Sequence, residues 1–187
     1  GLVAVEQLVA CQLVDRMQGR GPIVTAHCWA DLVRRCNRYQ MNGQPVTFGW
    51  LFTEIAFETC VPSPEVAQAL KLAAGELAHF EKRTRTSESG LRIYEEIWFP
   101  EKRFSDLSSS ERRDVISLAR FYGVMVGKIT EATTAVLSTE EIARHLEIEP
   151  GEALLRTARI THDREGTPVE YRIACTFLNG GHLATIV

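Results

Sequence analysis

Two arginines, Arg83 and Arg85, stand two positions apart in a segment that is predicted to form a β-strand. Because side chains along a strand alternate between the two faces of a sheet, both guanidinium groups are expected on the same face. A guanidinium is planar and offers several N–H donors, so two of them on one face form a receptor for a carboxylate or a phosphate. The pair therefore predicts an anion-binding site.

Glu95 lies on the next predicted strand, across a turn at residues 87–90. Its carboxylate could accept a hydrogen bond from a ligand hydroxyl, or it could pair with Arg83 or Arg85. The alternative to a binding site is a solvated ion pair between neighbouring strands on an exposed sheet face, which would contribute little to stability. The spacing of the three residues leaves both interpretations open.

The segment that holds these residues occurs twice in the chain. A stretch that begins at Ser63 is similar to a stretch that begins at Ser138, and from Val66 onward the two align without a gap at an offset of 76 residues. The identical pairs are Ala67 and Ala143, Leu70 and Leu146, Gly75 and Gly151, Glu76 and Glu152, Arg83 and Arg159, and Gly90 and Gly166. This many matches in one frame indicate an internal repeat.

The two copies differ in the residues that could bind a ligand. The positions that match Arg83, Arg85 and Glu95 hold Arg159, Thr161 and Tyr171 in the second copy. Since Thr161 and Tyr171 are neutral hydrogen-bonding residues, the difference predicts a ligand site with one anionic end and one polar end. Ordinary surface positions remain the alternative.

Each copy predicts a short helix, a tight turn at a glycine, and two strands joined by a polar turn. Ser63 is expected to cap the first helix, and Ser138 with Glu141 is expected to form the capping box of the second. A third helix is predicted between the copies, over 108–123, and a strand is predicted before the first copy, over 46–57. One such unit cannot cover its own apolar face, so two units are expected to share one sheet, which is an α+β fold.

Near the start of the chain, a Gly-Arg-Gly turn at residues 19–21 is predicted to join two short strands, after a short helical pattern. The whole chain, this basic hairpin included, has a net charge of −3, so a general polyanion-binding surface is excluded.

Several other kinds of site find no support. The five cysteines form no Cys-x-x-Cys pair and the five histidines show no ligand spacing, so neither a metal site nor a disulfide framework is expected. No Ser or Cys has a placed His partner and no phosphate-loop signature occurs, so no catalytic nucleophile and no cofactor is expected. No apolar run could span a bilayer and no signal peptide is recognisable, so the protein is expected in the cytoplasm and not in a membrane.

Two parts of the chain resemble a family of bacterial regulators. The stretch "LVDRMQGRGPIV" resembles the end of the winged helix-turn-helix of GntR-type regulators, with Leu8, Leu13, Gly19, Gly21 and Val24 in register. The region from about Val46 to Val187 resembles the UTRA effector-binding domain of the HutC subfamily, through "EVAQALKL", "RTR", "EEIWFP", "ARFYG" and "EIARHLEIEPGEALLRTARITHDREGTPVEY". The resemblance implies a chorismate-lyase-like fold with a central antiparallel sheet. It divides the chain into a partial winged helix (1–25), a linker (26–45) and a UTRA domain (46–187).

The resemblance also implies an effector site. In relatives that sense sugar phosphates, an Arg-x-Arg pair and a later glutamate contact the ligand, and these would be Arg83, Arg85 and Glu95. Where relatives carry a Ser-Leu-Tyr run, this chain has Arg113 and the two residues after it, so a carboxylate becomes as plausible a ligand as a sugar phosphate. The complete set of expected ligand-binding residues is Arg83, Arg85, Glu95, Arg113, Thr161 and Tyr171.

For DNA, the resemblance implies that the hairpin tip is a wing that meets the phosphate backbone or the minor groove. The expected DNA-contacting residues are Arg16, Gln18, Gly19, Arg20 and Gly21. The first two helices of the DNA-binding module are not in this sequence, so this polypeptide by itself is expected to bind operator DNA poorly. A homodimer is expected because palindromic operators suit a twofold axis. The alternatives are an enzyme of the chorismate lyase class and a regulator that only dimerises.

Overall fold

The computed structural model describes residues 14–15, 23–24, 36–46, 49–105, 107, 117 and 122–184. The chain divides into two compact units, Gly1–Arg38 and Tyr39–Val187. Each unit is described by itself below.

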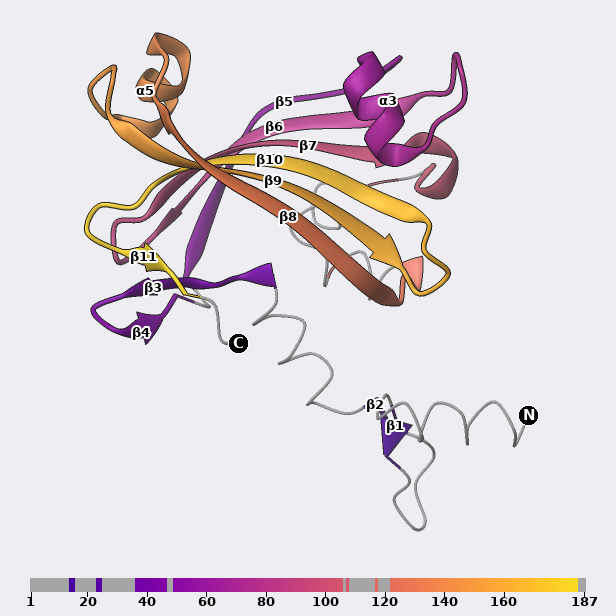
Figure 1. Cartoon of the computed structure of the whole chain (residues 1–187), viewed down its shortest axis with the longest axis horizontal. Helices are drawn as coiled ribbons and strands as arrows, with labels where there is room; N and C mark the ends of the chain where they lie inside the picture. Colours follow the sequence, from indigo (N-terminus) through magenta and orange to yellow (C-terminus); the bar gives the residue numbers. More distant parts are fainter. Residues whose placement is uncertain are drawn as a thin grey trace. The chain divides into compact units, whose positions relative to one another are not determined.

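The second unit is built on a six-stranded antiparallel sheet (Figure 1). The strands follow one another across the sheet in the order β5-β6-β7-β10-β9-β8. Their bounds are β5 Trp50–Cys60, β6 Ala78–Ser87, β7 Arg92–Pro100, β8 Val126–Leu137, β9 Ala153–Asp163 and β10 Pro168–Phe177. This is the α+β fold with a central antiparallel sheet that the sequence predicts.

The sheet consists of two equivalent halves that meet at its centre. One half is β5, the helix α3 (Pro64–Leu70), β6 and β7, and the other is β8, the helix α5 (Glu140–Leu146), β9 and β10. The two helices begin and end at positions exactly matched by the 76-residue offset of the repeat, which is therefore confirmed as a structural repeat. The repeat is longer than the sequence indicates, because each copy also includes the strand before its helix.

The ends of the two helices show how closely the copies agree. The Ser63 side chain accepts a hydrogen bond from the Val66 backbone N–H (3.4 Å), and the Thr139 side chain accepts one from the Ile142 N–H (3.3 Å). The prediction that Ser138 caps the second helix is therefore wrong by one residue. The Ser138 hydroxyl instead donates to the Glu149 carbonyl (3.2 Å), because Ser138 still belongs to the chain that leaves β8.

Both helices lie on the same side of the sheet, near its opposite ends (Figure 1). The α3 side chains Val66 and Leu70 pack against Tyr171 and Trp98 of the sheet. The α5 side chain Leu146 belongs to a second cluster with Tyr94, Leu154 and Cys175. The apolar stripe of each short helix is thus buried on one sheet face, which stabilises the helix more than its intrinsic propensity does.

A small second sheet, in the order β11-β3-β4, belongs to the same unit. It consists of β3 (Tyr39–Met41), β4 (Gln44–Pro45) and β11 (His182–Leu183). Tyr39 packs with Ile93 of the large sheet and with Leu91, which lies just before β7, and the Tyr39 hydroxyl lies 2.8 Å from Thr176 Oγ1. Residues 39–45, which the sequence places in a linker, are therefore part of the second unit in the structure. Likewise the strand predicted over 46–57 is found at Trp50–Cys60.

In the first unit, β1 (Val14–Asp15) pairs antiparallel with β2 (Ile23–Val24). This pairing confirms the predicted N-terminal hairpin. The expected DNA-contacting residues at its tip lie outside the described residues, as do Arg113 and most of the predicted third helix. Within the described residues, no helix has the length and apolar character needed to cross a bilayer.

The helix cap can be tested by comparing Thr139→Ala with Thr139→Ser. The alanine variant should lose about 1 kcal/mol of unfolding free energy, because no side chain then accepts the Ile142 N–H, whereas serine keeps the acceptor. Urea denaturation measures both values. An equal loss in the two variants would contradict the assignment of Thr139 as the cap.

Candidate functional site

The inner hairpins of the two halves, β6–β7 and β9–β10, differ in register at an irregularity in β10. In the first half, Arg83 of β6 lies opposite Glu95 of β7. In the second half the register shifts between Pro168 and Glu170, so that Arg159 of β9 lies opposite Arg172 and not opposite Tyr171. Such a β-bulge moves every later side chain of the strand to the other face of the sheet.

The bulge places Tyr171 away from the arginines. Its ring stacks on Trp98 with ring centres 5.6 Å apart, and its hydroxyl donates to Glu65 Oε1 of α3 (3.0 Å). Burial and the bond to Glu65 raise the pKa of Tyr171. The expectation that Tyr171 lies with Arg83 and Thr161 is therefore wrong, since it assumed that the two hairpins have the same register.

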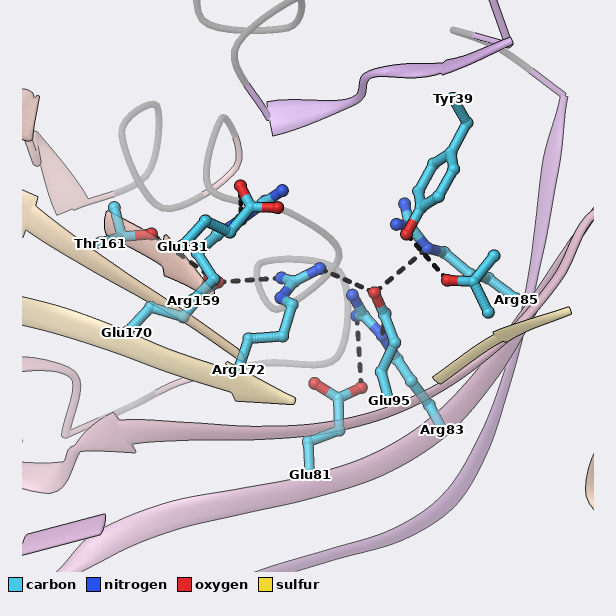
Figure 2. A network of polar contacts seen from close by, with 11 residues as sticks. Tyr39, Glu81, Arg83, Arg85, Glu95, Glu131, Arg159, Thr161, Glu170 and Arg172 are labelled. Atoms are coloured by element: carbon cyan, nitrogen blue, oxygen red, sulfur yellow. Dashed lines mark hydrogen bonds and ion pairs between the residues drawn. The ribbon is translucent and has the colours of Figure 1, made fainter. Parts of the chain in front are cut away.

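Glu95 is the centre of a network on the face opposite the two helices (Figure 2). Arg83 Nε donates to Glu95 Oε2 (2.9 Å) and Arg172 Nη1 donates to Oε1 (3.0 Å), while Arg85 Nε lies 3.2 Å from Oε1. Glu95 is fully buried. Burial alone would raise the pKa of Glu95, but Arg172, Arg85 and Arg83 outweigh it and hold this pKa well below its usual range.

Further ion pairs extend the network on both sides of Glu95. Glu81 Oε1 lies 3.5 Å from Arg83 Nη1, and Arg172 Nη2 donates to Glu170 Oε2 (2.9 Å). The Thr161 hydroxyl donates to Glu170 Oε1 (3.4 Å). Acids and arginines therefore alternate across three neighbouring strands. The Arg83–Glu95 ion pair is buried, so it is not the solvated surface pair that the sequence left open as an alternative.

A separate ion pair lies toward the β8 edge of the sheet, where Arg159 Nε is 3.4 Å from Glu131 Oε2.

The acids of the network also affect the pKa of Arg172. Burial would lower this pKa, but Glu170 and Glu95 raise it. Glu95 and Arg172 therefore both stay charged at neutral pH.

Arg85 differs from its neighbours. Its guanidinium carbon lies 4.5 Å from the centre of the Trp50 ring, and its Nε donates no hydrogen bond to any residue that the structure describes. Burial lowers the pKa of Arg85, and the neighbouring Glu95 opposes this effect. Arg172 Nε also lacks an acceptor among the described residues, but Arg172 donates to Glu95 and Glu170 through its terminal nitrogens, whereas Arg85 contacts Glu95 as an ion pair only.

Four of the six expected ligand-binding residues thus share one face of the sheet. They are Arg83, Arg85, Glu95 and Thr161. Sequence reasoning missed Glu81, Glu170 and Arg172, although a Glu-x-Arg pattern occurs at both Glu81–Arg83 and Glu170–Arg172. These two patterns do not match at the offset of 76, because the first lies in β6 and the second in β10, which are not equivalent strands of the repeat.

Within the described residues, no group of three His, Cys, Asp or Glu side chains is arranged to hold a metal ion. The arrangement instead offers guanidinium N–H donors and carboxylate acceptors, which are suited to a small polar ligand.

Comparisons with known proteins agree with this fold. The UTRA domain family matches residues 53–176, so the chain belongs to that family. The ligand-binding domain of a protein assigned to the GntR family of regulators, from Bordetella bronchiseptica, is similar with a TM-score of 0.72 and 22% identity, over 81% of this chain and 96% of that one. YydK from Bacillus subtilis, described as a possible transcriptional regulator, is similar with a TM-score of 0.71 and 20% identity, over 100% of this chain and 81% of that one. A GntR-family regulator from Enterococcus faecalis is similar with a TM-score of 0.67 and 21% identity, over 73% of this chain and 100% of that one.

The buried network predicts a pH-dependent contribution of Glu95. Glu95→Gln should lower the unfolding free energy at pH 7 by about 3–5 kcal/mol, because it removes the shared partner of three buried cations. The folded-state pKa of Glu95 lies below the unfolded value, so its contribution is present above about pH 4.3 and is lost as the pH falls further. The difference in unfolding free energy between wild type and Glu95→Gln should therefore shrink below that pH.

Denaturation of both proteins across this pH range measures the difference, with Glu88→Gln as a control at an exposed turn position. A difference that does not change with pH, or a Glu88→Gln loss of the same size, would contradict the role of Glu95.

Proposed function

We propose that this chain is the effector-binding part of a GntR-type transcription regulator of the HutC subfamily. The face that carries Arg83, Arg85 and Glu95 would bind a small anionic metabolite, a sugar phosphate or a carboxylate. The observation that carries the proposal is the convergence of three guanidinium groups, those of Arg83, Arg85 and Arg172, on this one face of a UTRA domain.

In this proposal the residues have different tasks. Arg85 binds the anionic group, because its Nε has no acceptor among the described residues. Arg83 and Arg172 hold Glu95 in place, and Thr161 supplies a polar group toward the other end of the site. Arg113, from the segment between the two copies, is proposed as an additional cation for the ligand.

Regulation would follow from a shift of populations. An effector that binds one arrangement of a homodimer more tightly moves the equilibrium toward it, and the coupling to DNA is reciprocal. The residues that would contact operator DNA in the full-length protein lie in the sequence between β1 and β2: Arg16, Gln18, Gly19, Arg20 and Gly21. The antiparallel pairing of Val14–Asp15 with Ile23–Val24 supports a wing there.

The effector site can be tested with a panel of anionic metabolites. A metabolite that raises the melting temperature of the wild-type chain should bind Arg85→Ala with about 2–4 kcal/mol less free energy, because a charge-assisted contact is lost. Isothermal titration calorimetry measures this change.

Tyr171→Phe is the matched control for this experiment. It removes a hydroxyl on the opposite face of the sheet and should leave ligand affinity unchanged. If Tyr171→Phe weakens binding as much as Arg85→Ala does, or if Arg85→Ala binds as tightly as wild type, the assignment of the site fails.

We further propose that the chain is not an enzyme, although the chorismate lyase class shares its fold. The N-terminal hairpin argues for a regulator, because a lyase has no need of a wing. Incubation with chorismate should give no pyruvate above the uncatalysed rate, as followed by a coupled lactate dehydrogenase assay. Turnover that Arg85→Ala abolishes would instead support the enzyme.

A further inference from the structure

A cavity with a volume of about 260 Å³ lies at the end of α3, where the chain passes from the helix toward β6. Three segments contribute to it: residues 70–77, residues 100–103 at the end of β7, and residues 167–168 at the start of β10. None of its lining residues belongs to the ion-pair network around Glu95. The cavity is therefore separate from the charged face of the sheet.

The walls of this cavity are mostly apolar. The apolar lining residues are Leu70, Leu72, Leu77, Pro100 and Pro168. Leu77 is 40% exposed, so the described part of the chain leaves this large apolar side chain partly uncovered. Because covering an apolar surface in a concave site is favourable, the walls are suited to an apolar group.

Two neighbouring cations, Lys102 and Arg103, line the same cavity from the 3-10 turn Glu101–Arg103. Lys102 Nζ donates to Glu76 Oε1 (2.6 Å), and the backbone N–H of Ala73 donates to Glu76 Oε2 (2.8 Å). These two bonds lower the pKa of Glu76, which also lines the cavity. The charge of Lys102 is thus matched inside the chain by Glu76.

Arg103 is held more loosely than Lys102. Its Nη2 lies 3.8 Å from Asp163 Oδ2, which is beyond hydrogen-bond distance, and Asp163 Oδ1 already accepts from the Thr167 N–H (2.8 Å). The half-exposed Arg103 side chain donates no hydrogen bond to any residue that the structure describes. Because a guanidinium has five N–H donors, this distant acid leaves Arg103 able to bind a further carboxylate, a pairing for which guanidinium geometry is suited.

The volume and the lining together define the ligand. An apolar cavity of about 150 Å³ holds a benzene ring, so this one admits a single ring with a short side chain, or a branched chain of similar size. Drug-sized ligands occupy pockets of about 300–1,000 Å³, which are larger. A sugar or a phosphate would place polar groups against leucines and prolines, which is costly, whereas an apolar body with one carboxylate matches both the walls and Arg103.

We propose that this cavity is a second ligand site, which binds a small monocarboxylate with an aromatic or branched apolar body. The apolar body packs against Leu70, Leu72 and Leu77, and the carboxylate accepts hydrogen bonds from Arg103, beside the ion pair of Lys102 with Glu76. The inference goes beyond the proposed function, because it concerns other residues and a ligand with an apolar body.

Four compounds test the ligand class: phenylacetate and 3-methylbutanoate, acetate, which lacks the apolar body, and phenylacetamide, which lacks the charge. In an NMR titration of the ¹⁵N-labelled chain, phenylacetate should bind at least tenfold more tightly than acetate or phenylacetamide, because packing and the charge-assisted contact both contribute. The amide signals that shift should belong to residues 72–77, 101–103 and 163–167. No binding of either larger acid, equal affinity for phenylacetamide, or shifts confined to other residues would overturn the inference.

Arg103→Gln tests the contact with the carboxylate. It should weaken phenylacetate binding about tenfold and reduce the preference for phenylacetate over phenylacetamide, because a charge-assisted contact is lost. Arg144→Gln, an equal change of charge at an exposed position of α5, is the matched control and should bind like wild type. Wild-type affinity in Arg103→Gln, or an equal loss in Arg144→Gln, would refute the contact.

Leu77→Gln tests the apolar wall, since it replaces the leucine by a polar side chain of similar size. It should weaken the binding of phenylacetate and phenylacetamide alike, by about tenfold. Leu137→Gln, at the exposed end of β8, is the matched control, with circular dichroism confirming that both variants fold. Unchanged binding in Leu77→Gln, or an equal loss in Leu137→Gln, would show that the wall does not hold the ligand.

Arg85→Ala separates this site from the proposed effector site and should leave the affinity for phenylacetate unchanged. Loss of phenylacetate binding in this variant would assign the acid to the charged face and refute the second site. Should Arg85→Ala not fold, the amide shifts of the wild-type chain decide between the two locations. The proposed function fails separately, if no anionic metabolite binds in a manner that depends on Arg85.

Discussion

The buried carboxylate of Glu95 is the interaction on which the rest of the second unit depends. A charged group removed from water is stable only when opposite charges and hydrogen bonds replace the solvent. Here the replacements come from β6 and β10, the strands on either side of Glu95 in β7, through Arg83, Arg85 and Arg172. Since β7 and β10 belong to different copies of the repeat, this network also joins the two halves of the sheet.

A single extra residue makes a symmetric fold into an asymmetric site. The two copies share helix positions and turn glycines and have strands of similar length, so their backbones alone would give two similar faces. Val169 is fully buried and packs with Ile97 and Phe99 on the network face, and Glu170 lies on that face as well, as expected at a β-bulge. After the bulge, Arg172 points toward Glu95, and Tyr171 joins the helix side. The network therefore has one centre and not two.

Both faces of the sheet pack apolar side chains, and they differ in where the buried ion pairs lie. The face toward α3 and α5 holds the aromatic stack of Phe80, Trp98 and Tyr171, with ring centres 5.1 and 5.6 Å apart. The opposite face holds the ion pairs around Glu95 beside another apolar cluster, which includes Ile97, Phe99 and Val169. The charged network therefore lies next to apolar packing on its own face of the sheet.

The sequence by itself determined the helix and the strand pair of each copy, the repeat and the shared face of Arg83, Arg85 and Glu95, because these follow from local signals: side-chain alternation, turn glycines and an offset of 76 residues. It also determined the N-terminal hairpin. The tertiary structure alone decided that Tyr171 leaves the site, that Glu81, Glu170 and Arg172 enter it, and that Tyr39–Pro45 packs with the second unit. Those outcomes depend on strand register and on contacts between distant segments, such as Tyr39 with Thr176. A bulge of one residue moves a side chain to the other face of the sheet, and the sequence before the bulge carries no local sign of it.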